Sequence, residues 1–173
     1  MIILYTGPMF SSKSYYLTQH LDDSSIAFIP KLDSRSGSYI ASRTGDKIPA
    51  QQISSVMDFG TNIVGKSKII IDEVQFLDPS IIDFVIKYKD TKTWILAGLD
   101  KDYLQIDFEN TSALLARADK VLNLTARCEK CGKSNAVYTC RKQSVGNDRI
   151  VVGSDQYYPL CKKCLEKYGN NSI

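Results

Sequence analysis

The sequence has no long hydrophobic run that could serve as a membrane span. No stretch of its 173 residues approaches the roughly 20 apolar residues that a membrane-spanning helix requires. The apolar start, Met1-Ile2-Ile3-Leu4, has no basic segment before it and leads into a glycine loop, so we expect a strand there and not a secretory signal. These absences predict a soluble, cytoplasmic protein with no membrane partner.

A concentrated basic patch is also absent. The net charge is only +3, from 22 lysines and arginines against 19 acidic residues, and the basic residues are scattered along the chain. Domains that bind nucleic acid usually gather lysine and arginine on one face. We therefore expect no nucleic-acid partner, whereas a modest positive balance suits a protein that handles polyphosphates.

Cysteine is scarce, but four of the five cysteines are paired in sequence. Cys128-x2-Cys131 and Cys161-x2-Cys164 have the spacing of two metal-binding knuckles, and four thiolates suit a closed tetrahedral Zn²⁺ site with no open position for chemistry. We expect a structural zinc ion here, the alternative being four buried free thiols. Cys140 is left over as an ordinary thiol.

Hydrophobic runs alternate between strand and helix patterns along the first part of the chain. We expect strands at 1–6, 26–29, 68–72, 94–98 and 121–124, and helices near 15–21, 79–86 and 114–118. Such alternation predicts an α/β fold with a mostly parallel sheet. The polar stretch from Lys31 to Ala50 is expected to be a loop with limited structure.

The character of the sequence changes after Arg127, where cysteine pairs and short polar stretches replace the long apolar runs. We therefore expect two parts: an α/β domain over residues 1–127 and a small C-terminal zinc-binding lobe over residues 128–173. The 29 residues between the two cysteine pairs would form a long loop whose base the metal holds.

A phosphate-binding loop is indicated between the first strand and the first helix. Gly7-Pro8-Met9-Phe10-Ser11-Ser12-Lys13-Ser14 follows the Walker A pattern, in which backbone N–H groups and a helix N-terminus surround phosphates. Lys13 would reach the β- and γ-phosphates, and the Ser14 hydroxyl would bind Mg²⁺. Ser12 stands where glycine is usual, so its Cβ is expected to crowd the site. The alternative is a simple polar turn.

Two carboxylates follow the buried strand that ends at Ile71. In P-loop enzymes of the expected RecA-like type, an acid in the place of Asp72 holds the Mg²⁺ shell. Glu73 would point away along the strand, or lie just past its end, and so be available as a general base for a substrate hydroxyl. The alternative is a strand end with two solvated acids.

The order of these motifs resembles the type II thymidine kinases, the zinc-containing cytosolic family. The resemblance covers nearly the whole chain and rests on five sequence motifs in addition to the cysteine pairs and Tyr157. These motifs are Gly7-Pro8-Met9-Phe10-Ser11-x-Lys13-Ser14, Lys31-x-Asp33-x-Arg35, Ser42-Arg43-x-Gly45, Asp72-Glu73-x-Gln75-Phe76 and Gly98-Leu99-Asp100-x-Asp102-Tyr103.

The resemblance implies transfer of the ATP γ-phosphate to the 5′-hydroxyl of thymidine, and also of deoxyuridine, giving dTMP in nucleotide salvage. Glu73, Lys13 and Arg35 would be catalytic, with Ser14 and Asp72 at the Mg²⁺ ion. Asp33 and Gln75 would join the phosphate loop, residues 7–14, in binding ATP.

Substrate contacts are implied in the same way. Met9, Phe76, Leu99, Tyr103 and Phe108 would line the base pocket, and a lasso-like loop between the cysteine pairs would cover thymine with Val151, Val152, Gly153 and Tyr157. For the aromatic residues, simple core packing is the alternative. A homotetramer and feedback inhibition by dTTP are further implications of the resemblance.

Two other functions remain open from sequence. One is a P-loop ATPase whose zinc lobe binds nucleic acid, although no exposed aromatic platform is evident beside Lys162, Lys163 and Lys167. The other is an inactive relative that only binds nucleotide, which Ser12 suggests.

Overall fold

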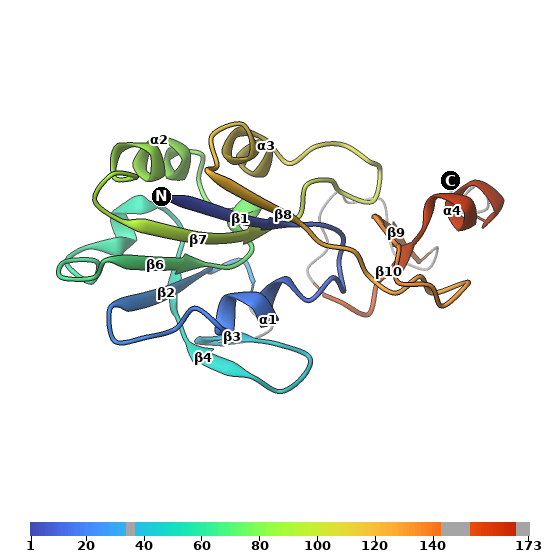
Figure 1. Ribbon diagram of the computed structural model, residues 1–173, viewed down its shortest axis with the longest axis horizontal. Helices are drawn as coiled ribbons and strands as arrows, with labels where there is room; N and C mark the ends of the chain where they lie inside the picture. Colours follow the sequence, from blue (N-terminus) through green and yellow to red (C-terminus); the bar gives the residue numbers. More distant parts are fainter. Residues whose placement is uncertain (34–36, 143–152, 169–173) are drawn as a thin grey trace.

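The computed structural model describes residues 1–33, 37–142 and 153–168. Its centre is a six-stranded sheet in the order β5-β2-β6-β7-β1-β8 (Figure 1). Every strand pairing within this sheet is parallel, which confirms the expected α/β class. The strands are β1 (Ile2–Thr6), β2 (Ser25–Pro30), β5 (Gln51–Ile53), β6 (Lys68–Ile71), β7 (Thr93–Gly98) and β8 (Lys120–Asn123).

The strand register brings the motifs to one edge of the sheet. Thr6 at the end of β1 pairs with Gly98 at the end of β7, and Ile71 at the end of β6 pairs with Phe28. In parallel sheets, ligands bind in crevices outside these carboxyl ends. The residues that follow β1, β6 and β7, namely Gly7, Asp72 and Leu99, therefore emerge at the same edge.

Alternating apolar residues bury both faces of the sheet. Ile69 and Ile71 of β6 pack on one face, below α2 (Ser80–Lys87) and α3 (Glu109–Leu115). Ile70 points to the opposite face, where α1 (Lys13–Thr18) lies (Figure 1). A strand buried on both faces needs a continuous apolar run, which is the pattern that the sequence showed at 68–71.

The prediction of a loop with limited structure between Lys31 and Ala50 was wrong. This segment contains an antiparallel hairpin of β3 (Tyr39–Ala41) and β4 (Lys47–Pro49), and the edge strand β5 follows it directly. Each hairpin strand buries one residue, Ile40 or Ile48, against the face that also holds α1. Three-residue strands with a single buried position are too short to show a period of two.

One short 3₁₀ turn, η3 (Val74–Phe76), leads from β6 into α2. Another, η2 (Val56–Phe59), follows β5. The sequence predicted a helix from residue 79. The helix begins one residue later, at Ser80, and Asp78 Oδ1 accepts a 2.9 Å hydrogen bond from the Ser80 N–H.

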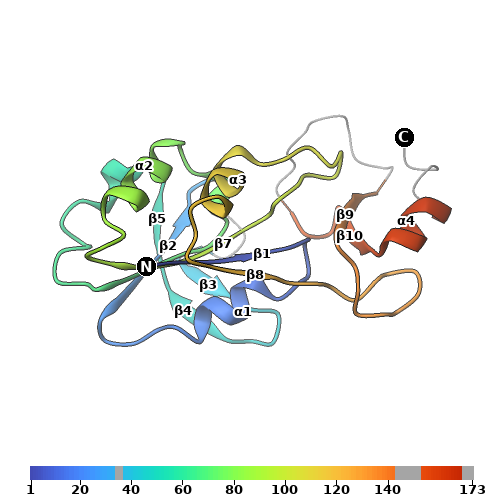
Figure 2. The same ribbon diagram turned by 45° about the horizontal axis from the view of Figure 1, so that its top comes forward.

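Beyond the carboxyl edge of the sheet lies a small lobe (Figure 2). It holds an antiparallel pair, β9 (Tyr138–Arg141) and β10 (Tyr157–Leu160), followed by α4 (Lys162–Tyr168). Its own buried cluster contains Ala126, Cys128, Ala136, Cys140, Leu160, Cys161 and Cys164. Among the described residues, none of the helices has the length and apolar character needed to cross a membrane.

Candidate active site

The turn after β1 requires glycine at its first position. Gly7 has φ of 138°, a region that side chains with a Cβ rarely adopt. A Cβ at Gly7 would lie 2.3 Å from the carbonyl oxygen of Leu124, which follows β8. Any other residue would push the loop away from the strand that supports it.

The Lys13 side chain is buried beneath this loop. Its Nζ donates to the carbonyl oxygens of Gly7 at 3.0 Å and Pro8 at 2.9 Å. These carbonyls hold a charged amine at the start of α1, beside the backbone N–H groups of the loop. The arrangement provides the positive charge that a polyphosphate would need at a helix N-terminus.

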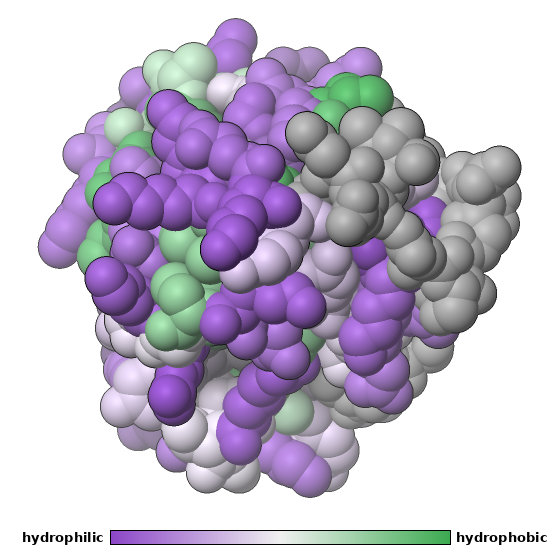
Figure 3. All heavy atoms as spheres, turned by 90° about the vertical axis from the view of Figure 1, so that its right-hand side faces the viewer, coloured by the Kyte–Doolittle hydropathy of each residue, from purple (hydrophilic) through white to green (hydrophobic). Residues whose placement is uncertain are grey.

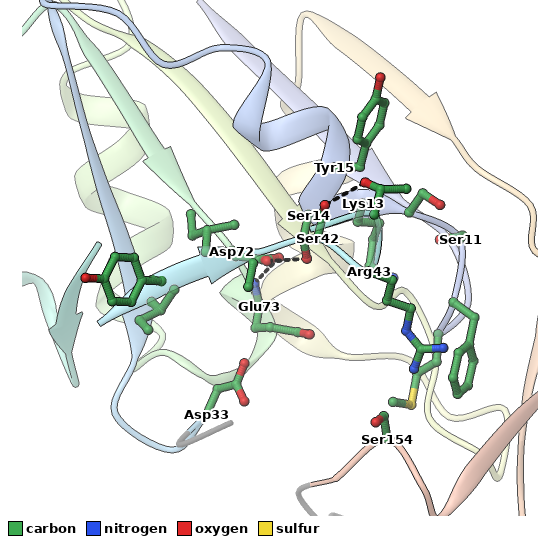
Figure 4. Close-up of a pocket in the computed structure, with 18 of the residues that line it drawn as sticks. Ser11, Lys13, Ser14, Tyr15, Asp33, Ser42, Arg43, Asp72, Glu73 and Ser154 are labelled. Atoms are coloured by element: carbon green, nitrogen blue, oxygen red, sulfur yellow. Dashed lines mark hydrogen bonds between the residues drawn. The ribbon is translucent and has the colours of Figure 1, made fainter. Parts of the chain in front are cut away.

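Ser14 and Asp72 come together across the pocket (Figure 4), in the Walker arrangement that the sequence predicted. The Ser14 hydroxyl donates to Asp72 Oδ2 at 2.6 Å, and Asp72 Oδ1 accepts from the Glu73 N–H at 2.9 Å. A hydroxyl and a carboxylate are both hard oxygen donors, so the pair fits the few protein ligands that Mg²⁺ takes beside phosphates and water.

Burial controls the ionisation of Asp72. The side chain is 6% exposed. Burial raises the pKa of Asp72 to about 7, and the Glu73 carboxylate adds to this, against the opposing hydrogen bond from Ser14. A cation placed between these groups would favour the ionised carboxylate.

Glu73 lies just past the end of β6 and not on the strand, which is the second of the two placements expected from sequence. Its backbone is in the left-handed region, with φ of 50° and ψ of 42°. The Glu73 Oε2 atom accepts a 2.6 Å hydrogen bond from Gln75 Nε2. The turn places its carboxylate among the residues that line the pocket.

These groups line a cavity of about 240 Å³. Most of the predicted phosphate and metal ligands are brought together there, and Figure 4 shows Ser14, Asp72 and Glu73 at its centre with Asp33 nearby. The predicted site residues in its lining are Met9, Phe10, Ser11, Ser12, Lys13, Ser14, Asp33, Asp72, Glu73 and Leu99. The predicted residues Arg35, Val151 and Val152 lie outside the described residues.

Other predicted site residues are described but do not contribute to this lining. Gln75 lies behind Glu73, with its side chain buried. Phe76 and Phe108 contact each other edge to face, with ring centroids 5.9 Å apart. The Arg141 guanidinium lies over the Tyr103 ring, with Cζ 4.9 Å from the ring centroid. Their assignment to the base pocket stays a prediction.

A second cavity, of about 560 Å³, adjoins the first towards the lobe. Phe10, Arg43 and Ser154 line both cavities, and Tyr157 lines the second. Because Ser154 lines the first cavity, this end of the predicted lasso lies at the pocket rim. Tyr157 thus lies next to the first cavity, although not within its lining.

Sequence reasoning missed the contribution of the β3–β4 hairpin. The pocket is closed on one side by Tyr39, Ile40, Ala41, Ser42, Arg43 and Thr44. The Arg43 guanidinium lies 3.9 Å from the ring centroid of Phe10, which places a cation at the mouth of the phosphate loop. The motif Ser42-Arg43-x-Gly45 was a sequence signal for this contribution. Its polar composition predicted a loop, however, and did not show that the segment lies beside the phosphate loop.

The four predicted zinc ligands converge in the lobe. Their Sγ atoms all lie within 4.8 Å of one another, and those of Cys131 and Cys161 are 3.8 Å apart. Tetrahedral Zn²⁺ with Zn–S bonds of about 2.3 Å would place its sulfurs about 3.8 Å apart. The geometry therefore fits a closed zinc site with four cysteine ligands.

The cysteines differ in how readily they ionise. Burial raises the pKa of Cys128, but backbone hydrogen bonds, led by the one from the Cys161 N–H, outweigh it and lower the value to about 6. Burial also raises the pKa of Cys164, to about 12, and that of the fifth cysteine, Cys140, to about 11. Cys128 is thus better prepared than Cys164 to bind a cation as a thiolate.

The lobe holds the phosphate loop directly. The Met9 N–H donates to Thr139 Oγ1 of β9 at 2.9 Å, and the Phe10 ring packs against the buried cysteine cluster. Phe10 has φ of 69°, so its backbone is kept in an unfavourable region by these contacts. Figure 3 views the molecule from the side of the lobe, and most of the residues coloured on this face are hydrophilic.

Ser12 allows a test of strain in the loop. It has φ of 65° and ψ of 25°, and its side chain makes no capping hydrogen bond to α1. The left-handed conformation costs a side chain about 1–2 kcal/mol, partly offset by the flexibility of an unfolded glycine, so Ser12→Gly should raise the free energy of unfolding by about 1 kcal/mol. Urea unfolding measures this.

Ser12→Ala is the matched control, because it removes the hydroxyl and keeps the Cβ. We expect it to give no stabilisation. If Ser12→Gly leaves stability unchanged or lowers it, the loop is not strained at this residue. Activity measured on the same variants shows whether the serine limits turnover.

The buried Asp72 gives a pH dependence with a definite sign. Because the pKa of Asp72 rises from 3.8 to about 7 on folding, its contribution to the free energy of unfolding is fully present below pH 3.8 and is lost as the pH rises through 7. Without Mg²⁺ or nucleotide, the free energy of unfolding of the unmodified protein should therefore fall by an amount on the order of a few kcal/mol from acidic to mildly basic pH. Asp72→Asn should abolish this fall.

Urea unfolding at several pH values checks this, with the exposed Asp83→Asn as control. The control should keep the pH slope of the unmodified protein. If Asp72→Asn shows the same pH slope as the unmodified protein, burial does not raise the pKa of Asp72.

Taken together, the parallel sheet, the glycine loop and the Ser14–Asp72 pair define a P-loop nucleotide-binding protein with a small metal-binding lobe. Comparison with known proteins narrows the class. A family model described as thymidine kinase matches residues 1–165, and the chain belongs to the thymidine kinase family.

Individual relatives agree with this family. The chain is 34% identical over 175 residues to a thymidine kinase of Ureaplasma parvum serovar 3, covering 91% of this chain and 78% of that protein. It is 34% identical over 177 residues to a thymidine kinase of Oryza sativa subsp. japonica, covering 94% of this chain and 65% of that protein. It is 32% identical over 176 residues to a thymidine kinase of Yaba monkey tumor virus, covering 98% of this chain and 96% of that protein. These matches do not favour the alternative of a nucleic-acid-binding ATPase.

Proposed function

We propose that this protein transfers the γ-phosphate of Mg·ATP to the 5′-hydroxyl of thymidine, and also of deoxyuridine, and so produces dTMP in nucleotide salvage. The observation that carries the proposal is the 2.6 Å Ser14–Asp72 hydrogen bond, in a pocket shared with Lys13 and Glu73. Membership of the thymidine kinase family supports the choice of acceptor.

On the donor side, the loop from Gly7 to Ser14 binds the triphosphate. Lys13 exchanges its bonds to the Gly7 and Pro8 carbonyls for phosphate oxygens. Ser14 and Asp72 would hold Mg²⁺, which would neutralise charge on the phosphates. Asp33 is buried and lines the pocket, and it would support the metal shell. Arg35 would stabilise the transferring group.

On the acceptor side, Glu73 accepts the proton of the 5′-hydroxyl as the oxygen attacks phosphorus. The O–H bond breaks, an O–P bond forms, and ADP leaves with the electrons of the broken P–O bond. The short acidic turn after β6 holds this base beside the phosphate loop. The main contribution of the protein to the rate is then to align the hydroxyl, the base and the γ-phosphate.

Recognition of the base falls to the aromatic residues and the lasso. Met9 and Leu99 line the pocket. Phe76, Phe108 and Tyr103 lie outside that lining and are assigned to the base pocket from the resemblance to the family. Val151, Val152, Gly153 and Tyr157 are assigned to thymine binding from the resemblance to the family.

The chain acts as two parts, an α/β kinase domain over 1–127 and a zinc-binding lobe with the lasso over 128–173. We further propose a cytoplasmic homotetramer that dTTP inhibits. These points rest on the resemblance to the family. The buried cluster of the lobe also includes Ala126, two residues before the proposed lobe begins at Cys128.

An ADP-release assay tests the function. Purified protein with Mg·ATP is offered thymidine, deoxycytidine, deoxyadenosine or deoxyguanosine, with a reaction lacking nucleoside as control. Thymidine should give the largest rate by at least tenfold. Equal rates with all four, or release that does not depend on nucleoside, would refute the assignment.

A further inference from the structure

The side chain of Gln75 is buried at the turn after Glu73, and both ends of its amide are engaged. Gln75 is 8% exposed. Its Nε2 donates to Glu73 Oε2 at 2.6 Å, and its Oε1 accepts from the Leu99 N–H at 3.1 Å. The amide therefore connects the acidic turn to the backbone that follows β7.

The turn that carries Gln75 is itself held from α3. Asn110 is 4% exposed, and its Nδ2 donates to the carbonyl oxygens of Val74 at 3.2 Å and Leu77 at 2.8 Å. These two bonds span η3 and leave it little freedom to move relative to the helix. A buried amide with satisfied bonds gives a rigid support.

Gly98, the last residue of β7, packs directly against the turn that carries Gln75. A Cβ at this position would lie 2.9 Å from Gln75 Oε1, from Val74 Cγ1 and from Thr111 Oγ1. Only a glycine lets β7 approach the turn so closely. The Gln75 side chain is thereby confined between the strand end and Glu73.

The requirement at position 75 is specific to an amide. Glu73 needs a donor that faces Oε2, whereas the Leu99 N–H needs an acceptor. Glutamate would supply the acceptor but set a second carboxylate against Glu73, and methionine would supply no donor. A glutamine is therefore the natural residue for joining these two partners.

We infer that Gln75 is a positioning residue that fixes the Glu73 carboxylate, and not a ligand of the nucleotide. The inference rests on the proposed function, in which Glu73 is the base. Glu73 lies on a left-handed, partly exposed turn, so loss of the Gln75 bond should let its carboxylate shift. A displacement of about 1 Å can cost about 10²-fold in rate.

The test compares Gln75→Ala and Gln75→Glu with the unmodified protein in thymidine-dependent ADP release. Each variant should lose roughly 10- to 100-fold in kcat, with KM for ATP and thymidine within about threefold. Gln51→Ala, an exposed glutamine on the edge strand β5, is the matched control and should leave both constants unchanged. Thermal unfolding of each variant reports whether the fold is retained.

A double variant separates the two roles of Gln75. If it acts through Glu73, Gln75→Ala should lower kcat by less than about twofold when Glu73→Gln is already present. Multiplied effects, a raised KM for ATP with kcat preserved, or a lower melting temperature with unchanged kinetics would overturn the inference. Failure of the proposed function is distinct, since the unmodified protein would then show no thymidine-dependent ADP release.

Discussion

Replacing Glu73 by glutamine is expected to lower kcat by about 10²- to 10⁴-fold, the usual contribution of a general base, while thymidine and ATP still bind. Glutamine has nearly the same shape, and its carbonyl oxygen can still accept the hydrogen bond from Gln75. What it cannot do is take a proton from the 5′-hydroxyl. Steady-state kinetics together with calorimetric titration of both ligands measures the two effects separately.

Glu109→Gln provides the control, because Glu109 is an exposed glutamate in the first turn of α3. It should retain kcat within about twofold, as surface substitutions usually do. An unchanged kcat in Glu73→Gln would remove Glu73 from the role of base. A loss of nucleotide binding of the same size as the loss of rate would point instead to a contact with the phosphates.

Loss of the metal site is the second large effect. Cys161→Ser should abolish stoichiometric zinc and weaken ATP binding by more than about tenfold, because binding of structural zinc carries about 10–16 kcal/mol of apparent folding free energy. The lobe would lose its support, and with it the Thr139 hydroxyl that holds the Met9 N–H and the cluster that holds Phe10. The phosphate loop would then relax.

Metal analysis and titration of ATP measure the two expectations for this variant. Cys140→Ala serves as control, since Cys140 lies in the same buried cluster but outside the four converging thiols. It should keep zinc and bind ATP normally. If Cys161→Ser loses zinc yet binds ATP as the unmodified protein does, the lobe does not support the phosphate loop.

The parts of the fold that could be predicted from sequence were those with long, regular signals. The run Lys68-Ile69-Ile70-Ile71 could only be a strand buried on both faces, and Gly7 and Lys13 stood in the order that a phosphate loop needs. The cysteine spacing was equally informative, because metal geometry fixes which thiols must meet.

The parts that could not be predicted depend on long-range packing. The β3–β4 hairpin has one buried isoleucine in each strand, and its position over α1 brings Arg43 to Phe10. No local pattern shows that contact. Gln75 was assigned to the nucleotide from its motif, whereas the burial of its side chain behind Glu73 depends on Gly98 and α3.

Ser12 illustrates a third case. The sequence showed that glycine is usual there, and crowding by its Cβ was the reason given. The structure adds a different reason, because the residue has a positive φ of 65° and its side chain is exposed. The departure therefore concerns the backbone conformation of the loop.

The fate of the ATP γ-phosphate tests the account most directly. With γ-³²P-labelled Mg·ATP and thymidine, the label should appear in dTMP, and 5′-deoxythymidine, which lacks the attacking hydroxyl, should give no labelled product. Glu73→Gln should slow the labelling without changing its product. Label released as inorganic phosphate at the same rate with or without thymidine would contradict the account and indicate an ATPase.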